Sequence, residues 1–336
     1  MHWQRHCPDA GTAGPTPVVA RSQAVIGGRL AVCVLTGGTT SVPRPVAVVS
    51  GAARGIGLAT ARRLNHTHRV ALVDLDGDGA RAAAAALGID PIAAACDITD
   101  ADSVRAAVGE IVEAAGGIDV VISNAGISTG GALRHLDPDV LAAQLNVNLT
   151  GNWRFIHACL PHVVDRRGYV LAVASAAAVL GSPGLGSYAA SKAGLEMLMD
   201  VLRLELKPLG VDVGVAYFSW IDTDMVRGAD RYWPGFAALR RELPEPIRRT
   251  LPVGAAADAI VRAVEGRRSH VVAPRYVGAL RRVRGLLPQI ATRDALRTAA
   301  EVDRLTAEMV AERGAFAAGV RSGEPATDAA AHSVGS

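Results

Sequence analysis

The chain has 336 residues, of which 50% are hydrophobic and 20% are charged, a composition typical of a soluble globular protein with a sizeable core. Its formal net charge of +3 is too small to indicate binding to nucleic acid. Its four cysteines, Cys7, Cys33, Cys96 and Cys159, are widely spaced and form no C-x-x-C motif. We therefore expect free thiols, no metal site and a cytoplasmic location.

The first 44 residues form a leader rich in Gly, Pro, Thr and Ser, without sustained periodicity. Its apolar part, residues 18–35, is interrupted by arginines and glycines. It therefore falls short of the roughly 20 apolar residues that a membrane span needs. We expect residues 1–44 to be disordered, or to reflect a start of translation assigned too far upstream.

From residue 45 onward, short apolar runs alternate with alanine-rich helical segments. We predict strands at residues 46–50, 69–74, 92–96, 118–123, 169–174, 211–217 and 270–273. We predict helices between them, for example at residues 56–64, 100–115 and 138–162. Strands that are apolar along their whole length are typical of a parallel sheet covered on both faces. The sequence thus predicts one α/β domain over residues 45–273, a doubly wound parallel sheet (Rossmann-like) with ligands at the carboxyl ends of its strands.

Beyond this domain, residues 274–313 are expected to form a helical extension, with helices at 277–290 and 292–312. Residues 314–336 are small and polar, and we expect them to be disordered.

The first of these two helices is amphipathic, and residues 275–290 carry four arginines and no acidic residue. Its apolar face comprises Tyr276, Ala279, Leu280, Val283, Leu286 and Leu287. Arg281 and Arg282 fall on the other face, and Arg284 lies at the margin. This pattern is typical of a helix on an anionic membrane surface. It also fits a helix packed on the enzyme body or on a second subunit with its arginines in solvent, which we favour.

A glycine-rich loop, SGAARGIG at residues 50–57, directly follows the first predicted strand and precedes a helix. Its glycines permit a tight turn and close approach of the backbone to a pyrophosphate, and the helix N-terminus offers amides. Asp74 ends the next strand, 17 residues after Gly57 (74 − 57), near the spacing of a carboxylate that binds ribose hydroxyls. An acidic residue in a turn before Gly77 is the alternative. Together these features predict a dinucleotide site.

Tyr188 and Lys192 stand four residues apart and share one face of a predicted helix. A phenol with a pKa of about 10 is a poor acid or base at neutral pH. A neighbouring ammonium would lower this pKa and make the tyrosine a usable proton donor and acceptor. Ser175, at the end of the preceding strand, could bind the same substrate oxygen. In isolation, a surface tyrosine and lysine on an amphipathic helix would explain the pattern as well, so the rest of the chain must decide.

With these motifs in order, residues 45–273 resemble the short-chain dehydrogenase/reductase family. The resemblance is carried by the glycine-rich loop, Asp97, Asn124-Ala125-Gly126, Asn148, Ser175, and Tyr188 with Lys192. It implies that Tyr188 is the catalytic acid/base, that Lys192 lowers its pKa and binds the nicotinamide ribose, and that Ser175 orients the substrate oxygen. It further implies that Asn148 holds a water linking Lys192 to solvent.

The same resemblance implies a set of contacts to the cofactor. They are made by Gly51, Arg54, Gly55, Ile56, Gly57, Asp74, Asp97, Ile98, Asn124, Ala125, Gly126, Tyr188, Lys192, Ile221 and Thr223. We expect NAD rather than NADP, because Asp74 would repel the extra phosphate, although Arg54 favours it. In one departure, Phe218-Ser219 stands where the family usually has Pro-Gly. This pair bears on the shape of that turn and on the placing of the nicotinamide ring.

The substrate side is expected to be apolar, since six of the 13 aromatic residues lie between residues 217 and 236. Alternatively, these aromatic residues only pack the segment that closes over the substrate against the rest of the domain. We expect a hydrophobic alcohol or ketone as substrate and a homo-oligomer. The alternative function is a non-catalytic dinucleotide-binding sensor or scaffold protein, against which the intact catalytic positions argue.

Overall fold

The computed structural model describes residues 21–26, 29–34, 44–88, 90–286, 293–314, 319–321 and 324–325. The chain divides into two units, Met1–Pro43 and Arg44–Ser336. In the first unit, β1 (Arg21–Ile26) and β2 (Arg29–Val34) form an antiparallel hairpin. The sequence predicts no regular structure in this leader, and the rest of it lies outside the described residues.

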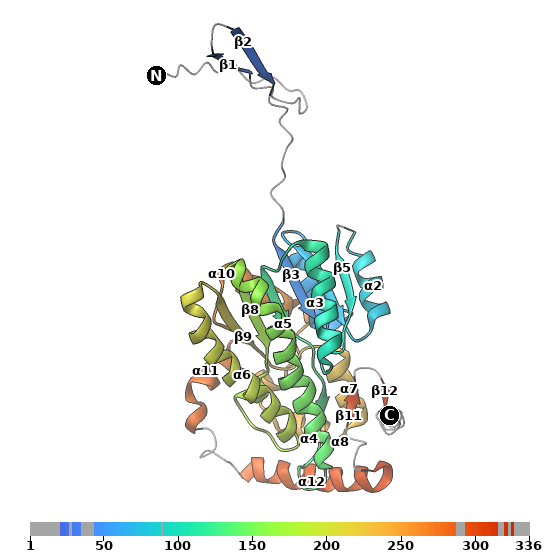
Figure 1. The fold of residues 1–336 in the computed structure, drawn as a ribbon. Helices are drawn as coiled ribbons and strands as arrows, with labels where there is room; N and C mark the ends of the chain where they lie inside the picture. Colours follow the sequence, from blue (N-terminus) through green and yellow to red (C-terminus); the bar gives the residue numbers. More distant parts are fainter. Residues whose placement is uncertain are drawn as a thin grey trace, which may run out of the picture. The chain divides into compact units, whose positions relative to one another are not determined.

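A sheet of seven parallel strands forms the centre of the second unit (Figure 1). Its strands are β3 (Val46–Ser50), β4 (Arg69–Asp74), β5 (Ile92–Ala95), β6 (Val120–Ser123), β8 (Tyr169–Val173), β9 (Asp212–Phe218) and β10 (His270–Ala273). Their order is β10-β9-β8-β6-β3-β4-β5. All seven were predicted, with ends shifted by only one or two residues.

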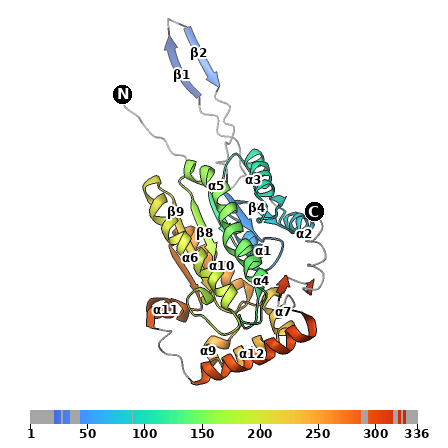
Figure 2. The same cartoon turned by 60° about the horizontal axis from the view of Figure 1, so that its bottom comes forward.

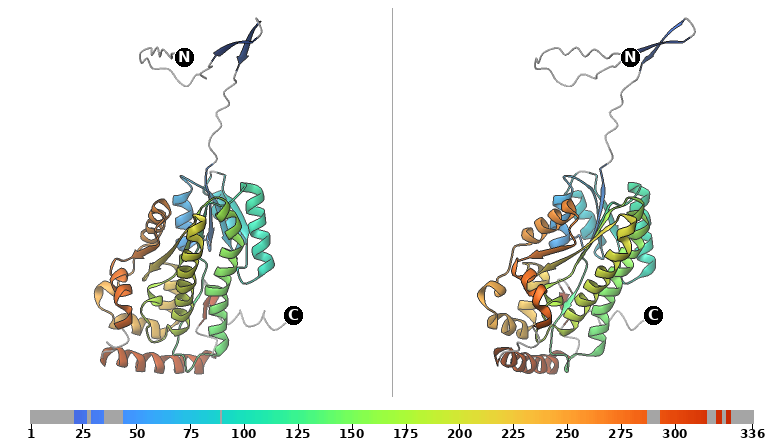
Figure 3. Two further views of the ribbon diagram at one scale, coloured as in Figure 1. Left: turned by 60° about the vertical axis from the view of Figure 1, so that its left-hand side comes forward. Right: turned by 90° about the vertical axis from the view of Figure 1, so that its left-hand side faces the viewer.

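Helices cover both faces of this sheet (Figure 3). One face packs against α3 (Ala101–Ala115), α5 (Asn152–Asp165) and α6 (Gly186–Leu206), and the other against α1 (Gly55–Leu64), α2 (Gly77–Ala85) and α10 (Val253–Gly266). Within β3, Val46 and Val48 belong to the first core, and Ala47 and Val49 to the second. Because successive strand residues point to opposite faces, a strand buried on both faces is apolar throughout. This confirms the predicted doubly wound α/β fold.

The strand order places the site at one position of the sheet. From β3 the chain runs outward through β4 and β5 on one side, and later through β6, β8, β9 and β10 on the other. The loops after β3 and β6 therefore diverge, which opens a crevice at the carboxyl ends of these strands.

The segment predicted as one helix over residues 138–162 is interrupted. It consists of α4 (Pro138–Leu145), a π-helical turn (Asn146–Gly151) and α5. Such turns are rare and frequently lie at functional sites. Asn148 lies within this turn, and the extra residue leaves no signal in the helical periodicity of the sequence.

The segment after β9 forms α7 (Asp224–Tyr232), α8 (Pro234–Glu242) and the short α9 (Glu245–Arg248). After β10 follow α11 (Tyr276–Val283) and α12 (Arg293–Arg313), and residues 287–292 lie outside the described part. Figure 2 shows α12 lying across one end of the unit. There it shares a third core with the α8 region, made of Leu185, Trp233, Phe236, Leu239, Val302 and Met309.

Two short strands lie in the tail, where the sequence predicts none. They are β11 (Gly319–Arg321) and β12 (Glu324–Pro325), and β11 pairs antiparallel with β7 (Ser128–Thr129). Among the helices of the described ranges, none combines the length and the apolar character needed to cross a membrane.

Candidate active site

The glycine-rich loop between β3 and α1 is shaped to receive an anionic group. Gly51 and Gly55 have φ values of 63° and 56°, which side chains rarely adopt. A Cβ atom on Gly57 would lie 2.0 Å from the Gly51 carbonyl oxygen, so the loop closes on itself there. A Cβ atom on Gly55 would meet nothing nearer than Thr223 Cγ2 at 3.7 Å, so its backbone faces open space. No side chain caps α1, and its first turn has no acidic residue, so this helix N-terminus fits a pyrophosphate.

Ser50 joins this loop to the one after β6. Its Oγ accepts hydrogen bonds from the backbone N–H groups of Asn124, at 2.9 Å, and Ala125, at 3.1 Å. In return, Asn124 Nδ2 donates to the carbonyl oxygens of Ser50 and Gly51, both at 3.1 Å. The two loops that border the crevice are therefore held in one arrangement. Ser50 was missed in the sequence, where it appears only as the last residue of a strand.

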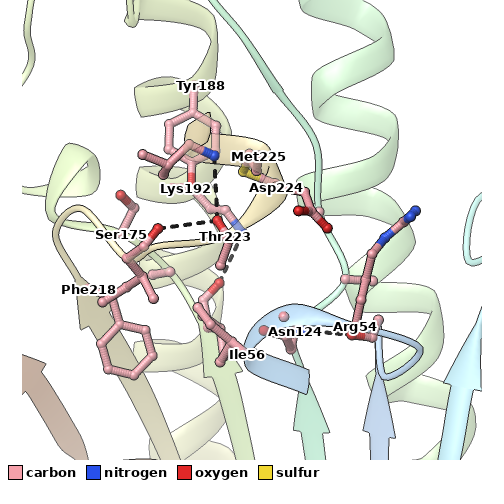
Figure 4. A pocket seen from close by; sticks show the side chains of 18 of the residues that line it. Arg54, Ile56, Asn124, Ser175, Tyr188, Lys192, Phe218, Thr223, Asp224 and Met225 are labelled. Carbon is pink, nitrogen blue, oxygen red and sulfur yellow. Dashed lines mark hydrogen bonds between the residues drawn. The ribbon is translucent and has the colours of Figure 1, made fainter. Parts of the chain in front are cut away.

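Asp74 is fixed at the end of β4 by backbone groups. Its Oδ2 accepts from Ala53 N at 2.9 Å, and its Oδ1 accepts from Asp76 N at 3.1 Å. It lines the same cleft as Arg54, whose side chain extends away from the glycine-rich loop in Figure 4. An anchored carboxylate at this strand end fits the hydroxyls of a ribose.

This cofactor cleft also holds Ser175, which follows β8, and Tyr188 and Lys192 from α6 (Figure 4). Lys192 is only 3% exposed, and its Nζ donates to the Val173 carbonyl oxygen at 2.9 Å. The same Nζ lies 6.0 Å from the centroid of the Tyr188 ring. The structure therefore brings together the three side chains that the sequence predicts to act as a unit.

Burial dominates the protonation of Tyr188 and Lys192. It raises the pKa of Tyr188, while a hydrogen bond with Ser175 acts in the opposite direction. It also lowers the pKa of Lys192 to about 8. Desolvation thus sets the direction of the Tyr188 shift, and Lys192 Nζ is directed to the Val173 carbonyl oxygen, so the lowering of the Tyr188 pKa by Lys192 stays a prediction.

The depressed pKa of Lys192 should destabilise the protein below alkaline pH. Between the unfolded value of 10.5 and the folded value of about 8, the unfolded chain binds the proton and the folded one does not. Stability from this group is thus present above pH 10.5 and lost as the pH falls through 8. In chemical denaturation, the free energy of unfolding of Lys192→Met relative to that of wild type should be about 2 kcal/mol greater at pH 7 than at pH 10. Lys207→Met, which removes the other lysine, should show no such gain, and a gain of equal size there would contradict the assignment.

Asn148 is buried in the π-helical turn and clamps the backbone of Ile127. Its Nδ2 donates to Ile127 O at 2.9 Å and to Ser191 Oγ at 3.1 Å, and its Oδ1 accepts from Ile127 N at 2.9 Å. Ser191 in turn donates to the Tyr188 carbonyl oxygen at 2.7 Å. A Cβ atom on Gly126 would lie 3.0 Å from Asn148 Oδ1 and 3.4 Å from Lys192 Nζ. Asn148 Oδ1 and Lys192 Nζ therefore both lie close to Gly126.

Most of the predicted cofactor-binding residues line the cleft, and the exceptions are Gly57, Asp97 and Ile98. Asp97 accepts hydrogen bonds from the Thr99 N–H, at 2.8 Å, and hydroxyl, at 2.7 Å, and Ile98 lies in the core. The cleft also contains residues that were not predicted: Val173, Ala174, Phe218, Ser219, Asp224, Met225 and Val226. Several of these follow β9, where the sequence departs from the family pattern.

The turn after β9 keeps its contacts to the cleft despite Phe218-Ser219. Phe218 is buried at the end of the strand, and Ser219 N donates to Ala273 O at 3.0 Å. Ile221 and Thr223 still line the cleft. Thr223 also caps α7 by accepting from Val226 N at 3.5 Å.

The acidic pair flanking Thr223 has an ordinary explanation. Asp222 and Asp224 bind Arg227 at 2.6 Å and 2.8 Å. No group of three or more potential metal ligands is found within the described residues.

An apolar cavity adjoins the cleft and shares Ser175, Tyr188, Ser219, Met225 and Val226 with it. Its other lining residues are Ser128, Ala176, Ala177, Val179, Leu180, Ser182, Leu185, Trp220, Ala229, Phe236, Leu243, Ile247, Tyr276, Val277 and Leu280. No charged side chain occurs among these described lining residues. Of the aromatic residues predicted to close over the substrate, Trp220 and Phe236 reach the cavity, and Trp233 packs behind them in the third core.

The helix α11 packs on the enzyme body, which is the alternative that we favoured from the sequence. Glu196, only 2% exposed on its side chain, lies on α6 four residues after Lys192 and binds Arg281 at 3.2 Å and Arg284 at 2.9 Å. Tyr217 donates to the same carboxylate at 2.9 Å. The predicted solvated basic rim is therefore wrong for Arg281 and Arg284, because a buried carboxylate from another element pairs with both. The apolar face of α11 meanwhile contributes to the cavity wall.

Residues 45–232 match the short chain dehydrogenase family, which is more than half of the chain. Trans-4-hydroxycyclohexanecarboxylate dehydrogenase from Sinomonas cyclohexanicum is 32% identical over 200 residues, covering 56% of this chain and 77% of that protein. The 3-oxoacyl-[acyl-carrier-protein] reductase MabA from Mycobacterium avium is 34% identical over 185 residues, covering 54% and 69%.

Solved structures share the fold. A short chain dehydrogenase/reductase from Burkholderia phymatum in complex with NAD superposes with a TM-score of 0.65 at 22% identity, covering 75% of this chain and 96% of that one. An NADPH-bound short chain oxidoreductase from Pseudomonas aeruginosa PAO1 gives a TM-score of 0.61 at 26% identity, covering 68% and 94%. The fold, the glycine-rich loop and the match over residues 45–232 agree, and this protein therefore belongs to the short chain dehydrogenase family of NAD(P)-dependent oxidoreductases.

Proposed function

We propose that this enzyme interconverts a hydroxyl and a carbonyl group on an uncharged, hydrophobic substrate, with NAD as its preferred cofactor. One observation carries the proposal. Ser175 and Tyr188 line both the cofactor cleft and the apolar cavity, so a substrate oxygen beside them would face both compartments. The nicotinamide ring would supply or accept the hydride when bound.

The proton chemistry falls to this chain's own side chains. Tyr188 would exchange a proton with the substrate oxygen. Ser175 Oγ accepts from Ala177 N at 3.1 Å and also hydrogen-bonds Tyr188, which places its hydroxyl where it would orient the same substrate oxygen. Asn148 Oδ1 and Lys192 Nζ both lie near Gly126, and Asn148 would hold a water that relays protons between Lys192 and solvent. This is the role that the resemblance implies for Asn148.

The cofactor would lie along the cleft, with its pyrophosphate on the glycine-rich loop. Asp74 would hold the adenosine ribose, Lys192 the nicotinamide ribose, and the turn from Ile221 to Thr223 the carboxamide. The remaining contacts would come from Gly51, Arg54, Gly55, Ile56, Asn124, Ala125 and Gly126, which all line the cleft. The open backbone at Gly55 and the uncapped N-terminus of α1 support this placement.

The substrate class follows from the charge of the cavity. The name of the Sinomonas cyclohexanicum relative specifies a carboxylate. A carboxylate in the cavity of this chain would meet no cation among the described lining residues, and an unpaired buried charge is costly. We therefore propose a neutral alcohol or ketone.

We also propose a homo-oligomer in a reducing, cytoplasmic environment. On α6, the exposed residues Met197, Val201 and Leu204 stand four and three positions apart and form an apolar stripe. Cys96 and Cys159 are buried free thiols, as expected where disulfides do not form. We do not propose membrane contact through residues 275–290, since Arg281 and Arg284 already bind Glu196.

A panel of alcohols with NAD, followed by absorbance of the reduced cofactor, tests the proposal. Neutral cyclic alcohols should show kcat/KM about 100-fold above matched hydroxycarboxylates, because a few kcal/mol separate the two in a cavity without a cation. Equal use of both would contradict the substrate class. If the protein bound NAD and NADH tightly but neither oxidised any alcohol nor reduced any ketone, the result would instead support the alternative function, a dinucleotide-binding sensor or scaffold.

A further inference from the structure

Two hydroxyl groups meet at the wall of the apolar cavity. Tyr276, the first residue of α11, donates a hydrogen bond to Ser219 Oγ at 2.8 Å, across 57 residues of sequence. Ser219 lines both the cofactor cleft and the apolar cavity, and Tyr276 lines the cavity. The pair therefore lies on the same cavity as Ser175 and Tyr188, but on different elements.

The hydroxyl groups of Ser219 and Tyr276 carry two protons, and the hydrogen bond between them uses one. Tyr276 has a single hydroxyl proton, and Ser219 Oγ at 2.8 Å is a far better acceptor than Ile247 O at 3.4 Å. When Tyr276 donates to Ser219 Oγ, the described part of the chain offers the Ser219 proton no acceptor, and this proton is then available to a ligand in the cavity. Burial raises the pKa of Tyr276, so the phenol stays protonated at physiological pH.

We propose, building on the function proposed above, that Ser219 and Tyr276 form a second recognition point for the substrate. It binds an uncharged oxygen, a carbonyl or a hydroxyl, at a position of the substrate other than the one that reacts at Tyr188. A substrate oxygen that accepts from a lone hydroxyl in an apolar wall strengthens binding, because a hydroxyl left unpaired in the substrate complex costs free energy. The enzyme would therefore prefer hydrophobic substrates that carry two oxygen functions.

The surrounding contacts keep this recognition point in place relative to the catalytic residues. Arg281, on the same short helix as Tyr276, binds the buried Glu196 on α6. Tyr188 lies on α6 as well, eight residues before Glu196. The Ser219 backbone is held by Ala273 O at 3.0 Å, just before α11. Both points of substrate contact are thus tied to one helix, which sets their spacing.

The proposal is tested by comparing matched ketones with one and two carbonyl groups. Calorimetry would give dissociation constants for 1-decalone, 1,5-decalindione and 2,6-decalindione, with oxidised NAD present so that no turnover occurs. At least one dione should bind wild type about tenfold more tightly than 1-decalone, a difference of about 1.4 kcal/mol. In Ser219→Ala this ratio should fall to about one. In Tyr276→Phe it should fall by less, because Ser219 keeps its proton but loses the hydrogen bond that orients it. The double variant should show no further loss beyond that of Ser219→Ala, because the two hydroxyls act as a unit.

Tyr169→Phe is the matched control, since its buried hydroxyl donates to Arg268 O at 2.7 Å and does not line the cavity. In this variant, the ratio of the dissociation constants of 1-decalone and the dione should equal that of wild type. The inference is overturned if no dione gains over 1-decalone in wild type, or if the gain survives in Ser219→Ala. A purely structural hydrogen bond would weaken all ketones alike and keep the ratio. Loss of binding for every ketone would overturn the proposed function as well, whereas equal binding of mono- and diketones overturns this inference alone.

Discussion

Tyr188→Phe is expected to lower turnover by about 10³-fold, within the range that a positioned general acid or base contributes, while the dissociation constant of NADH changes by less than about twofold. The substitution removes one oxygen and keeps the aromatic ring, so we expect the cleft to retain its shape. Because burial raises the pKa of Tyr188, the phenol is protonated at neutral pH and is ready to donate to a substrate oxygen during ketone reduction. Alcohol oxidation needs the deprotonated form, so its rate should rise with pH into the alkaline range.

The measurement combines steady-state kinetics in both directions with NADH binding by fluorescence. Tyr232→Phe is the control, since Tyr232 lies at the surface against Arg231 and outside the cleft and the cavity. Lys192→Ala should impair both turnover and cofactor binding, because in the proposed arrangement Lys192 would also hold the nicotinamide ribose. If Tyr188→Phe retained a tenth or more of wild-type turnover, Tyr188 would not be the proton carrier.

The doubly wound fold could be predicted because its physical cause is visible in single segments. Strands such as β3 are apolar at every position from Val46 to Val49, since both faces are covered by helices. The glycine-rich loop was predictable for a similar local reason. Gly51 and Gly57 meet backbone atoms so closely that no other residue fits, and this requirement shows in the sequence as glycine.

Features that depend on distant partners could not be predicted. The apolar face of α11 was apparent, but the carboxylate that pairs with Arg281 lies 85 residues earlier, on another helix. Amphipathic character shows that a face is covered and not what covers it. Likewise, nothing near Tyr276 indicates its bond to Ser219, and only the folded chain brings them together. Asp97 binds Thr99 locally, and its contact to the cofactor, which rests on its motif position, stays a prediction.

The choice of cofactor gives the second large effect. NAD should exceed NADP in kcat/KM by about 100-fold, on the order of 3 kcal/mol, because an added phosphate on the ribose would face Asp74. This carboxylate is held by the Ala53 and Asp76 N–H groups, so it cannot turn away from the cleft without losing both bonds. A second carboxylate, Asp76, follows two residues later and caps α2. The end of β4 is therefore acidic, and we expect this charge to outweigh the favourable charge of Arg54 in the same cleft.

Asp74→Ala should narrow this preference to about tenfold or less by relieving the repulsion, and Asp74→Asn should do the same while keeping an acceptor for Ala53 N. Asp78→Asn is the matched control, because it removes one negative charge from the exposed first turn of α2 and does not line the cleft. Its NAD-to-NADP ratio should stay within about twofold of wild type, since exposed charges are screened by solvent. Initial rates with both cofactors at several concentrations give the ratios directly. A wild-type enzyme that prefers NADP, or a ratio that moves as much in Asp78→Asn as in Asp74→Ala, would show that Asp74 does not contact the ribose and that Arg54 governs the choice.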